Sequence, residues 1–379
     1  MLKHSIRLML IAALAFVLLG CDLAGDEHED EAHGDMAALQ EQLASKDAEI
    51  ASLQAQISAQ PAATTSRLET VMARGRLVCA SRTDVPGYGF LDASGRNVGF
   101  DIDLCRAVAA AVFGNGDAVE VIPISAAERG PTIQSGDVDM LARTVTWTTT
   151  RDSQWGNYTV ITFYDGQGFM VRKDKNIDSA LKLGGTSVCV TSGTTTELNL
   201  ADYFRQNNME LEAVVFENTA AVVSAYEQGR CDAFTNDKSQ LAALKSGLQN
   251  PADHVVLPET ISKEPLTTVV PHGDDQWLDL VKTVLYVLIN AEEFGVTQAN
   301  VDQMMSHENI QIRRMLGTEG EFGQSDLGLK ATFAQDVLKA VGNYGEIYDR
   351  YMGPEGLDLP RGINELWTNG GLIYAPPLR

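Results

Sequence analysis

Basic residues are scarce in this sequence. Its 379 residues include 29 Lys and Arg against 51 Asp and Glu, which gives a formal net charge of -22 at pH 7. The phosphates of a nucleic acid would repel such a chain, so no nucleic-acid partner is expected. The Gly-Lys-Ser/Thr signature of a phosphate-binding P-loop is also missing. The composition therefore predicts a solvated acidic protein.

The N-terminus lacks a hydrophobic run long enough for a comfortable membrane span. Its apolar segment, Leu8 to Leu19, is too short, and it follows the basic residues Lys3 and Arg7. A charged start, a short apolar core and a small residue at the end are typical of a secretory signal. We therefore expect residues 1–20 to be the signal peptide of an exported protein.

The end of this signal carries a candidate lipidation site. Leu18-Leu19-Gly20-Cys21 resembles a bacterial lipobox, in which the cysteine is acylated and becomes the mature N-terminus. Asp22 resembles the residue that retains enterobacterial lipoproteins at the inner membrane. We predict a protein of the periplasm or cell envelope that a lipid on Cys21 anchors to the inner membrane. The alternative is ordinary signal cleavage nearby, which would leave Cys21 as a free thiol.

The segments before residue 67 differ in composition from the rest. Residues 21–35 are dominated by Asp and Glu, which predicts a disordered acidic linker rather than a metal site. Residues 36–58 carry apolar side chains at heptad-like spacing, and residues 59–66 form a second linker. The heptads predict a short coiled coil that could form a homo-oligomer, and an isolated helical stalk is the alternative. The heptad positions are Met36, Leu39, Leu43, Ile50, Leu53 and Ile57.

From residue 67 onward, strand and helix patterns alternate, which predicts an α/β fold with mostly parallel sheets flanked by helices. The alternation restarts after a glycine-containing extended segment, Thr162 to Val171, and the chain crosses back at Ser262 to Pro265. Two crossings predict two lobes. The first would comprise residues 67–166 and 265–379, including a C-terminal extension, and the second residues 167–264.

The globular part contains four cysteines but no Cys-x-x-Cys spacing, which argues against a zinc or thioredoxin-like site. An exported compartment is oxidising, so the even count predicts two disulfides. Four cysteines permit three connectivities, and the sequence alone does not choose among them. We favour Cys79 with Cys105 and Cys189 with Cys231, because each pair lies within one predicted lobe and leaves the lobes free to move.

The stretch Leu141 to Asp152 carries most of the candidate ligand-binding residues. A buried apolar strand ends here, and hydroxyls, an indole and two guanidiniums follow without Gly or Pro. Ligands bind beyond the carboxyl ends of parallel strands, and arginine matches a carboxylate with two parallel hydrogen bonds. The stretch therefore predicts a carboxylate-binding cleft, with solvated surface residues as the alternative. The candidates are Arg143, Thr144, Thr146, Trp147 and Arg151.

Other strand ends supply further candidates. The loop after the first strand contains Tyr88, which is expected to form another wall of the cleft. Thr194 begins a capping box at a helix N-terminus whose free amides suit an anion, although an ordinary capped helix is the alternative. Asp237 ends a strand and could receive an ammonium group or act as a helix N-cap. Asp101 is predicted to cap the helix Ile102 to Phe113.

Five long segments together resemble a known family. They are GFDIDLCRAVAAAVF (99–113), FYDGQGFM (163–170), SGTTTELNL (192–200), ISKEPL (261–266) and YAPP (374–377). From about Arg76 to the C-terminus the chain resembles the periplasmic substrate-binding proteins of polar amino-acid ABC importers, solute-binding protein family 3, and is most similar to the general L-amino acid-binding branch. The resemblance implies the two-lobe, type 2 periplasmic-binding-protein fold.

The same resemblance implies roles for individual residues. The matched positions are Arg151 for the substrate α-carboxylate, Thr146 and Thr194 or Thr195 for its hydroxyl and amide partners, Asp237 for the α-ammonium group, and Tyr88 and Trp147 beside the side chain. The chain also departs from the branch, which usually has Asn at Thr144, Thr at Asn236 and a Ser-Gln-Gly-Leu-like loop at Arg82 to Val85. Arg82 with Asp84 could favour a ligand with a polar or charged side chain.

The function implied is capture of L-amino acids between the lobes and delivery to ABC permease subunits, with hinges near Gly166 and Ser262. No cofactor or metal is expected, and the protein is not expected to be an enzyme. The alternatives are a ligand-binding sensor or structural lipoprotein without a permease, and a dehydratase on the same fold. The dehydratase is disfavoured because His254, His272 and His307 lie outside the predicted strand-end loops.

Overall fold

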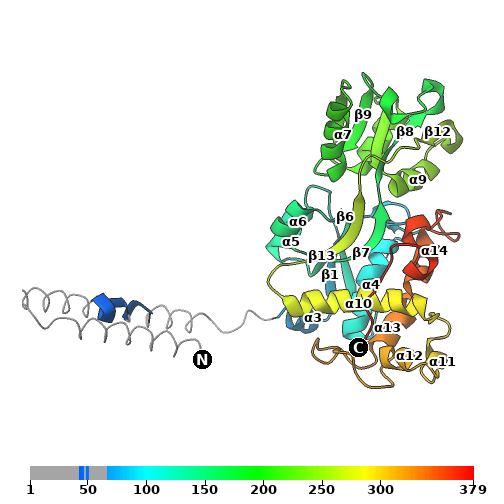
Figure 1. Ribbon diagram of the computed structural model, residues 1–379. Helices are drawn as coiled ribbons and strands as arrows, with labels where there is room; N and C mark the ends of the chain where they lie inside the picture. The colour runs from blue at the N-terminus through cyan, green and yellow to red at the C-terminus, as the bar shows by residue number, and fades with distance from the viewer. Residues whose placement is uncertain (1–41, 47, 51–65) are drawn as a thin grey trace, which may run out of the picture. The chain divides into compact units, whose positions relative to one another are not determined.

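The computed structural model describes residues 42–46, 48–50 and 66–379 (Figure 1). The first two segments are helical, and the side chains of Leu43 and Ile50 within them are exposed. The predicted signal peptide, Cys21, the acidic linker and the other heptad positions lie outside the described residues. In the described part of the chain, no helix is long and apolar enough to cross a bilayer. The chain divides into two compact units, Met1–Thr64 and Thr65–Arg379, and the second contains both lobes.

The first lobe is built on a mixed sheet. Within residues 66–379 its strands lie in the order β5 (Val119–Pro123), β1 (Leu77–Ser81), β6 (Met140–Thr146), β13 (Glu264–Val270) and β7 (Asn157–Asp165). β1 pairs in parallel with β5 and β6, whereas β13 pairs antiparallel with β6 and β7. β13 therefore runs against the other strands of this sheet, which all point the same way.

The second lobe repeats this plan. Its described strands lie in the order β10 (Glu212–Phe216), β9 (Ser187–Thr191), β11 (Ala233–Asp237), β8 (Gln167–Arg172) and β12 (His254–Val256). β9 pairs in parallel with β10 and β11, and β8 pairs antiparallel with β11 and β12. Here β8 alone runs against the others. The two sheets confirm the predicted two-lobe α/β fold.

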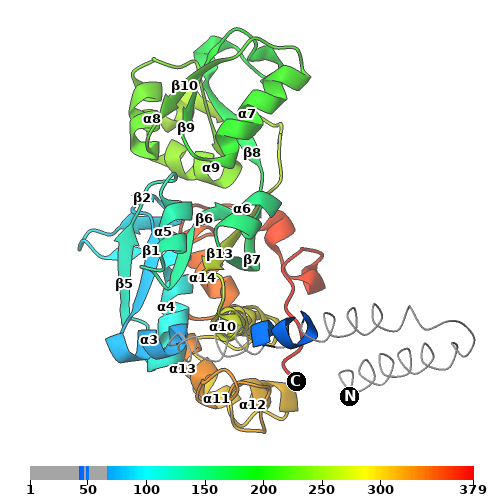
Figure 2. The same ribbon diagram turned by 90° about the vertical axis from the view of Figure 1, so that its left-hand side faces the viewer.

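Helices pack against both sheets (Figures 1 and 2). Those of the first lobe are α3 (Arg67–Arg74), α4 (Phe100–Phe113), α5 (Arg129–Ser135), α6 (Thr149–Gln154), α10 (Asp275–Glu293), α11 (Val301–Met304), α12 (Ile310–Met315), α13 (Phe333–Val341) and α14 (Tyr344–Tyr351). Those of the second lobe are α7 (Thr195–Gln206), α8 (Thr219–Glu227) and α9 (Lys238–Ser246). A small sheet of β2 (Asp84–Val85), β3 (Gly89–Leu91) and β4 (Asn97–Val98) completes the first lobe. Short 3-10 helices are η1 (Lys173–Lys175), η2 (Ala180–Lys182), η3 (Pro251–Asp253), η4 (Gly362–Asn364) and η5 (Trp367–Asn369).

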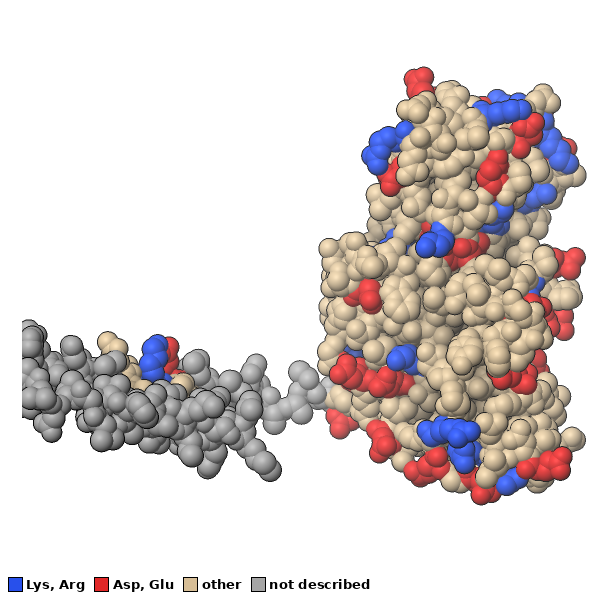
Figure 3. All heavy atoms as spheres, viewed as in Figure 1, with Lys and Arg blue, Asp and Glu red and all other residues tan. Residues whose placement is uncertain are grey.

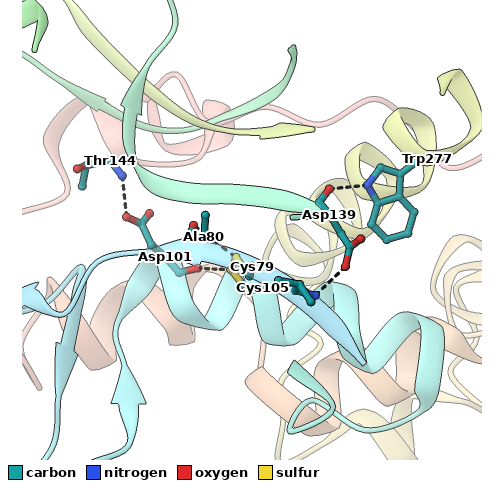
Figure 4. Close-up of a disulfide and its surroundings, with 8 residues drawn as sticks. Cys79, Ala80, Asp101, Cys105, Asp139, Thr144 and Trp277 are labelled. Carbon is teal, nitrogen blue, oxygen red and sulfur yellow. Dashed lines mark hydrogen bonds between the residues drawn. A yellow bond between two sulfur atoms is a disulfide. The ribbon is translucent and has the colours of Figure 1, made fainter. Parts of the chain in front are cut away.

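The start of α4 differs from the prediction. Gly99 occupies the N-cap position, and Asp101 lies inside the helix, so the expected cap is wrong. A Cβ at Gly99 would lie 2.2 Å from the carbonyl oxygen of Tyr88, which requires glycine there. The buried carboxylate of Asp101 instead accepts a hydrogen bond from the backbone N–H of Thr144 at 2.8 Å (Figure 4).

Both disulfides have the favoured pairing. Cys79 bonds to Cys105 within the first lobe, and Cys189 bonds to Cys231 within the second. The first bond joins β1 to α4 (Figure 4). Because neither bond crosses between the lobes, neither restricts a hinge motion.

Asp139, just before β6, ties several first-lobe elements together. Its fully buried carboxylate accepts from the backbone N–H of Val78 at 2.7 Å and forms ion pairs with Arg67 and Arg74 of α3. Its carbonyl oxygen accepts from the indole N–H of Trp277 on α10 at 2.9 Å (Figure 4). These contacts hold α3 and α10 against the central strands.

The two lobes are joined at the ends of β7 and β13 (Figure 1). Gly166 separates β7 from β8, and a Cβ there would lie 2.2 Å from the methyl group of Thr260, so the crossing chains approach too closely for a side chain. The C-terminal extension supports β7 beside this crossing. The side-chain amide of Asn364 accepts from Tyr164 N–H at 2.7 Å and donates to the Tyr164 carbonyl at 3.0 Å.

Surface charge follows the composition. On the face shown in Figure 3, acidic side chains are spread over both lobes, and basic side chains occur as separate small groups. Four arginines of the described residues are buried and so contribute little to this surface: Arg82, Arg129, Arg143 and Arg151.

Candidate ligand-binding cleft

A polar cavity lies between the strand ends of the two sheets. Its lining residues end or follow β1, β5 and β6 of the first lobe and β9, β10 and β11 of the second, which is where α/β sheets bind ligands. The lining residues are Arg82, Ala126, Arg129, Arg143, Thr144, Thr146, Thr191, Thr194, Thr195, Thr196, Thr219, Thr235, Asn236, Asp237 and Gln240.

Three buried arginines of the first lobe, Arg129, Arg143 and Arg151, form no ion pair with any carboxylate of the described residues. Their guanidiniums donate to backbone carbonyl oxygens instead: Arg129 to Ala126, Thr144 and Gly193, Arg143 to Ile124, and Arg151 to Thr146. Burial lowers the pKa of all three, to about 9 for Arg143. This wall therefore presents positive charge at a desolvation cost that an anionic ligand would offset.

The three arginines are not equivalent. The carboxylates of Asp84 and Asp101 act on Arg143 at longer range and offset part of its charge. Arg129 receives no such compensation from the first lobe, since its strongest charged neighbours are Arg151 and Arg143 themselves. The carboxylates of Glu264 and Asp237 likewise offset part of the charge of Arg151. Arg129, which lines the cavity, is therefore the strongest candidate for holding an anion, and Arg151 lies next to it against the same ring, that of Trp155.

Arg82 connects the two lobes across the cavity. Its side chain is 3% exposed, and it pairs with Asp84 at 2.8 Å and donates to the Thr144 hydroxyl at 3.1 Å within its own lobe. In the second lobe it donates to Gln240 Oε1 at 2.7 Å and to Thr219 Oγ1 at 3.0 Å. Gln240 in turn donates from Nε2 to Asp237, so one hydrogen-bonded chain runs from Arg82 to Asp237.

Three carboxylates of the hinge and the second lobe, those of Asp165, Glu264 and Asp237, lie close enough together for the first two to act on Asp237. Burial, followed by the charges of Asp165 and Glu264, raises the pKa of Asp237 well above its usual range. Burial raises the pKa of Asp165 to about 6, although the Ser239 hydroxyl and N–H donate to it. Glu264 accepts from Thr195, Asn199 and Ser262. A cation near Asp237 would relieve the repulsion among these groups.

The loop before α7 has the predicted cap at a helix N-terminus. Thr194 is the N-cap, and its hydroxyl accepts from the Glu197 N–H at 3.0 Å. The Glu197 carboxylate accepts from the N–H of Gly193 rather than from that of Thr194, so only half of the predicted capping box is present. The Thr195 hydroxyl lies 3.3 Å from that of Thr146 across the cavity. Thr146, Thr194 and Thr195 thus lie together.

The strand leading to the arginines is longer than expected. The prediction ended it at Leu141, whereas β6 continues to Thr146, so Arg143, Thr144 and Thr146 belong to the strand. Pairing with β13 explains the extension, because Leu266 lies opposite Thr146. Thr144 has a φ of 45°, which is costly for a β-branched residue, and the Asp101 carboxylate holds its N–H in this conformation.

Three predicted site residues lie outside the cavity lining. Tyr88 is buried, and its hydroxyl lies 2.7 Å from that of Ser239. The Trp147 ring stacks on Tyr158 at 5.8 Å between centroids. Arg151 lies behind Thr146, with its Nη1 3.2 Å from the Thr146 carbonyl oxygen.

Several residues that line the cavity were not among the predicted site residues, including Arg129, Thr219 and Gln240. Arg129 follows the end of β5, so the strand-end rule applied to the other loops could have found it. Gln240 lies in the first turn of α9, where the sequence gives no comparable signal. In the described residues there is no cluster of three metal-ligating side chains.

Two lobes of this topology, with a polar cavity at their facing strand ends and chain crossings beside it, define a ligand-capturing protein of the periplasmic-binding class. Comparison identifies the family: residues 77–354 match the model of the bacterial extracellular solute-binding proteins, family 3. The chain belongs to this family.

Several known proteins are similar to this one over most of the chain. The general L-amino acid-binding periplasmic protein AapJ of Rhizobium johnstonii is 52% identical over 321 residues, which are 84% of this chain and 94% of that protein. The glutamate/glutamine/aspartate/asparagine-binding protein BztA of Rhodobacter capsulatus is 45% identical over 84% of this chain and 95% of its own. An ABC transporter periplasmic binding protein of Brucella ovis, solved with glutathione bound, has a TM-score of 0.80 at 47% identity and covers 83% of this chain and 99% of its own.

Proposed function

We propose that this protein captures L-amino acids in the periplasm for an ABC transporter, and that it binds most tightly those ligands that carry an additional carboxylate. The observation that carries the proposal is the arrangement of charge. Buried guanidiniums without carboxylate partners in the described residues form one wall of the cavity, and Asp237 lies on the other. A ligand with an ammonium group and two carboxylates complements both walls.

The roles of individual residues follow from this complementarity. Arg151 and Arg129 hold the α-carboxylate, with hydroxyls from Thr146, Thr194 and Thr195 beside it. Asp237 receives the α-ammonium group. Arg143, with the Thr144 hydroxyl, receives a second carboxylate. Arg82, which is paired with Asp84, links the lobes instead, while Tyr88 and Trp147 support the walls from behind. The similar proteins support a ligand of this chemistry. AapJ and BztA are named for the amino acids that they bind, and the Brucella protein holds glutathione, an acidic peptide.

Closure of the lobes is the mechanism of capture. Each lobe contributes only part of the ligand's charge complement, so the ligand is fully bound only when the two are together. Arg82 adds cross-lobe hydrogen bonds, and Gly166 and Ser262 lie where the chain crosses. The closed form is what the permease subunits recognise. The protein performs no catalysis and uses no cofactor.

Isothermal titration calorimetry on the full-length protein, freed of copurified ligand by unfolding and refolding, tests the proposal. The probes are L-glutamate, L-aspartate, L-glutamine, L-asparagine, reduced glutathione and L-lysine. We expect micromolar or tighter binding, strongest for a probe with two carboxylates and weakest for L-lysine. No binding to any probe by folded protein, or strongest binding to L-lysine, would contradict the proposal.

Anchoring is a separate part of the proposal. A lipid on Cys21 holds the protein at the inner membrane, and residues 36–58 hold the binding unit away from the bilayer and associate as a coiled coil. Membrane fractionation checks the anchor: the wild-type protein is expected in the inner-membrane fraction and Cys21→Ser in the soluble periplasmic fraction. Equal distribution of the two proteins would contradict lipidation. Sedimentation of the full-length protein with and without residues 36–58 checks the oligomer.

A further inference from the structure

One aromatic ring of the first lobe lies against two of the buried arginines. The guanidinium carbon of Arg151 is 4.7 Å from the centroid of the Trp155 ring, and that of Arg129 is 5.8 Å away. Both distances are within the range of a cation–π interaction. Trp155 immediately follows α6, and its backbone N–H donates to the Arg151 backbone carbonyl oxygen at 2.7 Å, so the two residues belong to the same helical turn.

The chemistry of this support matters for binding. A buried arginine is most often stabilised by a carboxylate, which would cancel its charge and compete with an anionic ligand. The face of an indole attracts a cation through its quadrupole but carries no net charge. The ring can therefore fix the guanidiniums and leave their positive charge available.

A neighbouring glycine is matched to the ring. A Cβ on Gly130, the residue after Arg129 in α5, would lie 2.7 Å from Trp155 Nε1 and 2.8 Å from its Cε2. Any side chain at this position would displace the indole. Glycine at position 130 thus leaves the space that the Trp155 ring occupies next to Arg129.

We infer that Trp155 is a positioning residue that holds Arg129 and Arg151 together as one receptor for the ligand α-carboxylate. The inference rests on the proposed function, because it assigns that carboxylate to these two arginines. It adds that their separation is set by a neutral ring, which contacts both guanidiniums from outside the cavity lining.

The test compares two probes in the full-length protein by calorimetry, with weak binding measured by displacement of L-glutamate. L-Glutamate carries the α-carboxylate, and L-isoglutamine has a neutral amide in its place. For Trp155→Leu we expect the dissociation constant of L-glutamate to rise roughly tenfold or more, and that of L-isoglutamine to change less than about threefold. Trp155→Phe should recover most of the L-glutamate affinity, because a benzene ring retains the face. Gly130→Ala should weaken L-glutamate binding by displacing the ring without removing it.

Trp367→Leu is the matched control, because Trp367 is half-exposed on the C-terminal extension, and it should bind as the wild type does. Thermal melting of each variant confirms that it is folded. Unchanged L-glutamate affinity in Trp155→Leu, or equal weakening of both probes, would overturn the role of Trp155 while the wild type still binds. If the wild-type protein binds neither probe nor any other amino acid, the proposed function fails and this inference fails with it.

Discussion

The two walls of the cleft differ in the charge of the side chains that line them. The first-lobe wall buries arginines that donate to backbone carbonyls and rest on an aromatic ring. The second-lobe wall consists mainly of threonines, which are polar without charge, and of the single lining carboxylate, that of Asp237. In both walls the side chains come from the carboxyl ends of parallel strands.

The difference shows how one fold can prepare both ends of a zwitterion site. If an arginine and a carboxylate shared a wall, they would form an ion pair with each other in the empty site. Neither charge would then be available to a ligand. Placing the arginines on one lobe and Asp237 on the other leaves each with unfavourable burial energy, as their shifted pKa values indicate. A ligand that bridges the walls relieves both. The following predictions test this separation, from the largest expected effect to the smallest.

Removing one arginine of the anion receptor should have the largest effect. For Arg151→Ala we expect the dissociation constant of L-glutamate to rise by roughly a hundredfold or more, because the buried ligand carboxylate loses one of its two charged partners and keeps only Arg129. Calorimetry gives the comparison. Arg205→Ala on the exposed surface of α7 is the control and should bind normally. A change of less than about threefold in Arg151→Ala would show that this arginine does not hold the ligand.

Removing the charge of the opposite wall should weaken binding somewhat less, because water can partly solvate the ligand ammonium group. Asp237→Asn is expected to weaken binding by roughly tenfold to a hundredfold. Because burial raises the pKa of Asp237, the free site takes up a proton at a pH where an ordinary aspartate is still ionised. Wild-type affinity should therefore fall on acidification at a pH where an ordinary aspartate is still ionised, and the fall should be shallower in Asp237→Asn. Identical pH profiles would exclude Asp237 as the ammonium receptor.

The cross-lobe bonds of Arg82 test how far the walls depend on each other. Arg82→Ala removes the hydrogen bonds to Gln240 and Thr219, which favour closure. We expect roughly tenfold weaker binding. Small-angle X-ray scattering at a fixed subsaturating ligand concentration should show a larger radius of gyration than for the wild type. Arg96→Ala, on the exposed surface of the same lobe, should change neither quantity, and an unchanged radius in Arg82→Ala would mean that closure does not depend on this residue.

The smallest effect concerns the stability of the free protein. Burial raises the pKa of Asp165 to about 6, so between about pH 4 and pH 6 the folded state binds more protons than the unfolded state. The ionisation of this carboxylate therefore lowers the free energy of unfolding as the pH rises through that window. The free energy of unfolding remains reduced by the full amount at pH 7. Asp165→Asn should stabilise the protein at pH 7 by on the order of 1 kcal/mol and flatten the pH dependence of urea unfolding. The exposed Asp202→Asn serves as the comparison, and a destabilised Asp165→Asn would contradict the sign.

Local sequence patterns predicted the fold and the general position of the cleft. Strand and helix signals repeat along the chain, and parallel strands necessarily bring their carboxyl ends to one edge. This rule placed Asp237 at that edge, and the rule together with the capping-box pattern placed Thr194 there; both residues line the cavity. Their roles in binding stay predictions.

Details that depend on distant contacts were not predictable in this way. The extension of β6 to Thr146 requires Leu266, which is remote in sequence. Tyr88 and Trp147 belong to the expected strand-end segments, yet neither lines the cavity: the Tyr88 ring packs edge-on against Phe163, and the Trp147 ring stacks on Tyr158. The orientation of a side chain at a strand end depends on such tertiary contacts, and the local sequence pattern does not contain them.

The contact between Asn364 and Tyr164 has a consequence for the folding of this protein. β7 is the last strand of the first-lobe sheet, and its outer edge offers unpaired peptide groups to any other chain. At Tyr164 the Asn364 amide supplies one acceptor and one donor, as the backbone of a further strand would. Since Asn364 follows every strand of both lobe sheets in the chain, this position of the edge is covered only after both sheets have been synthesised. Truncation before Asn364 would leave a sheet edge open to intermolecular pairing and aggregation, even though every residue that lines the cavity would still be present.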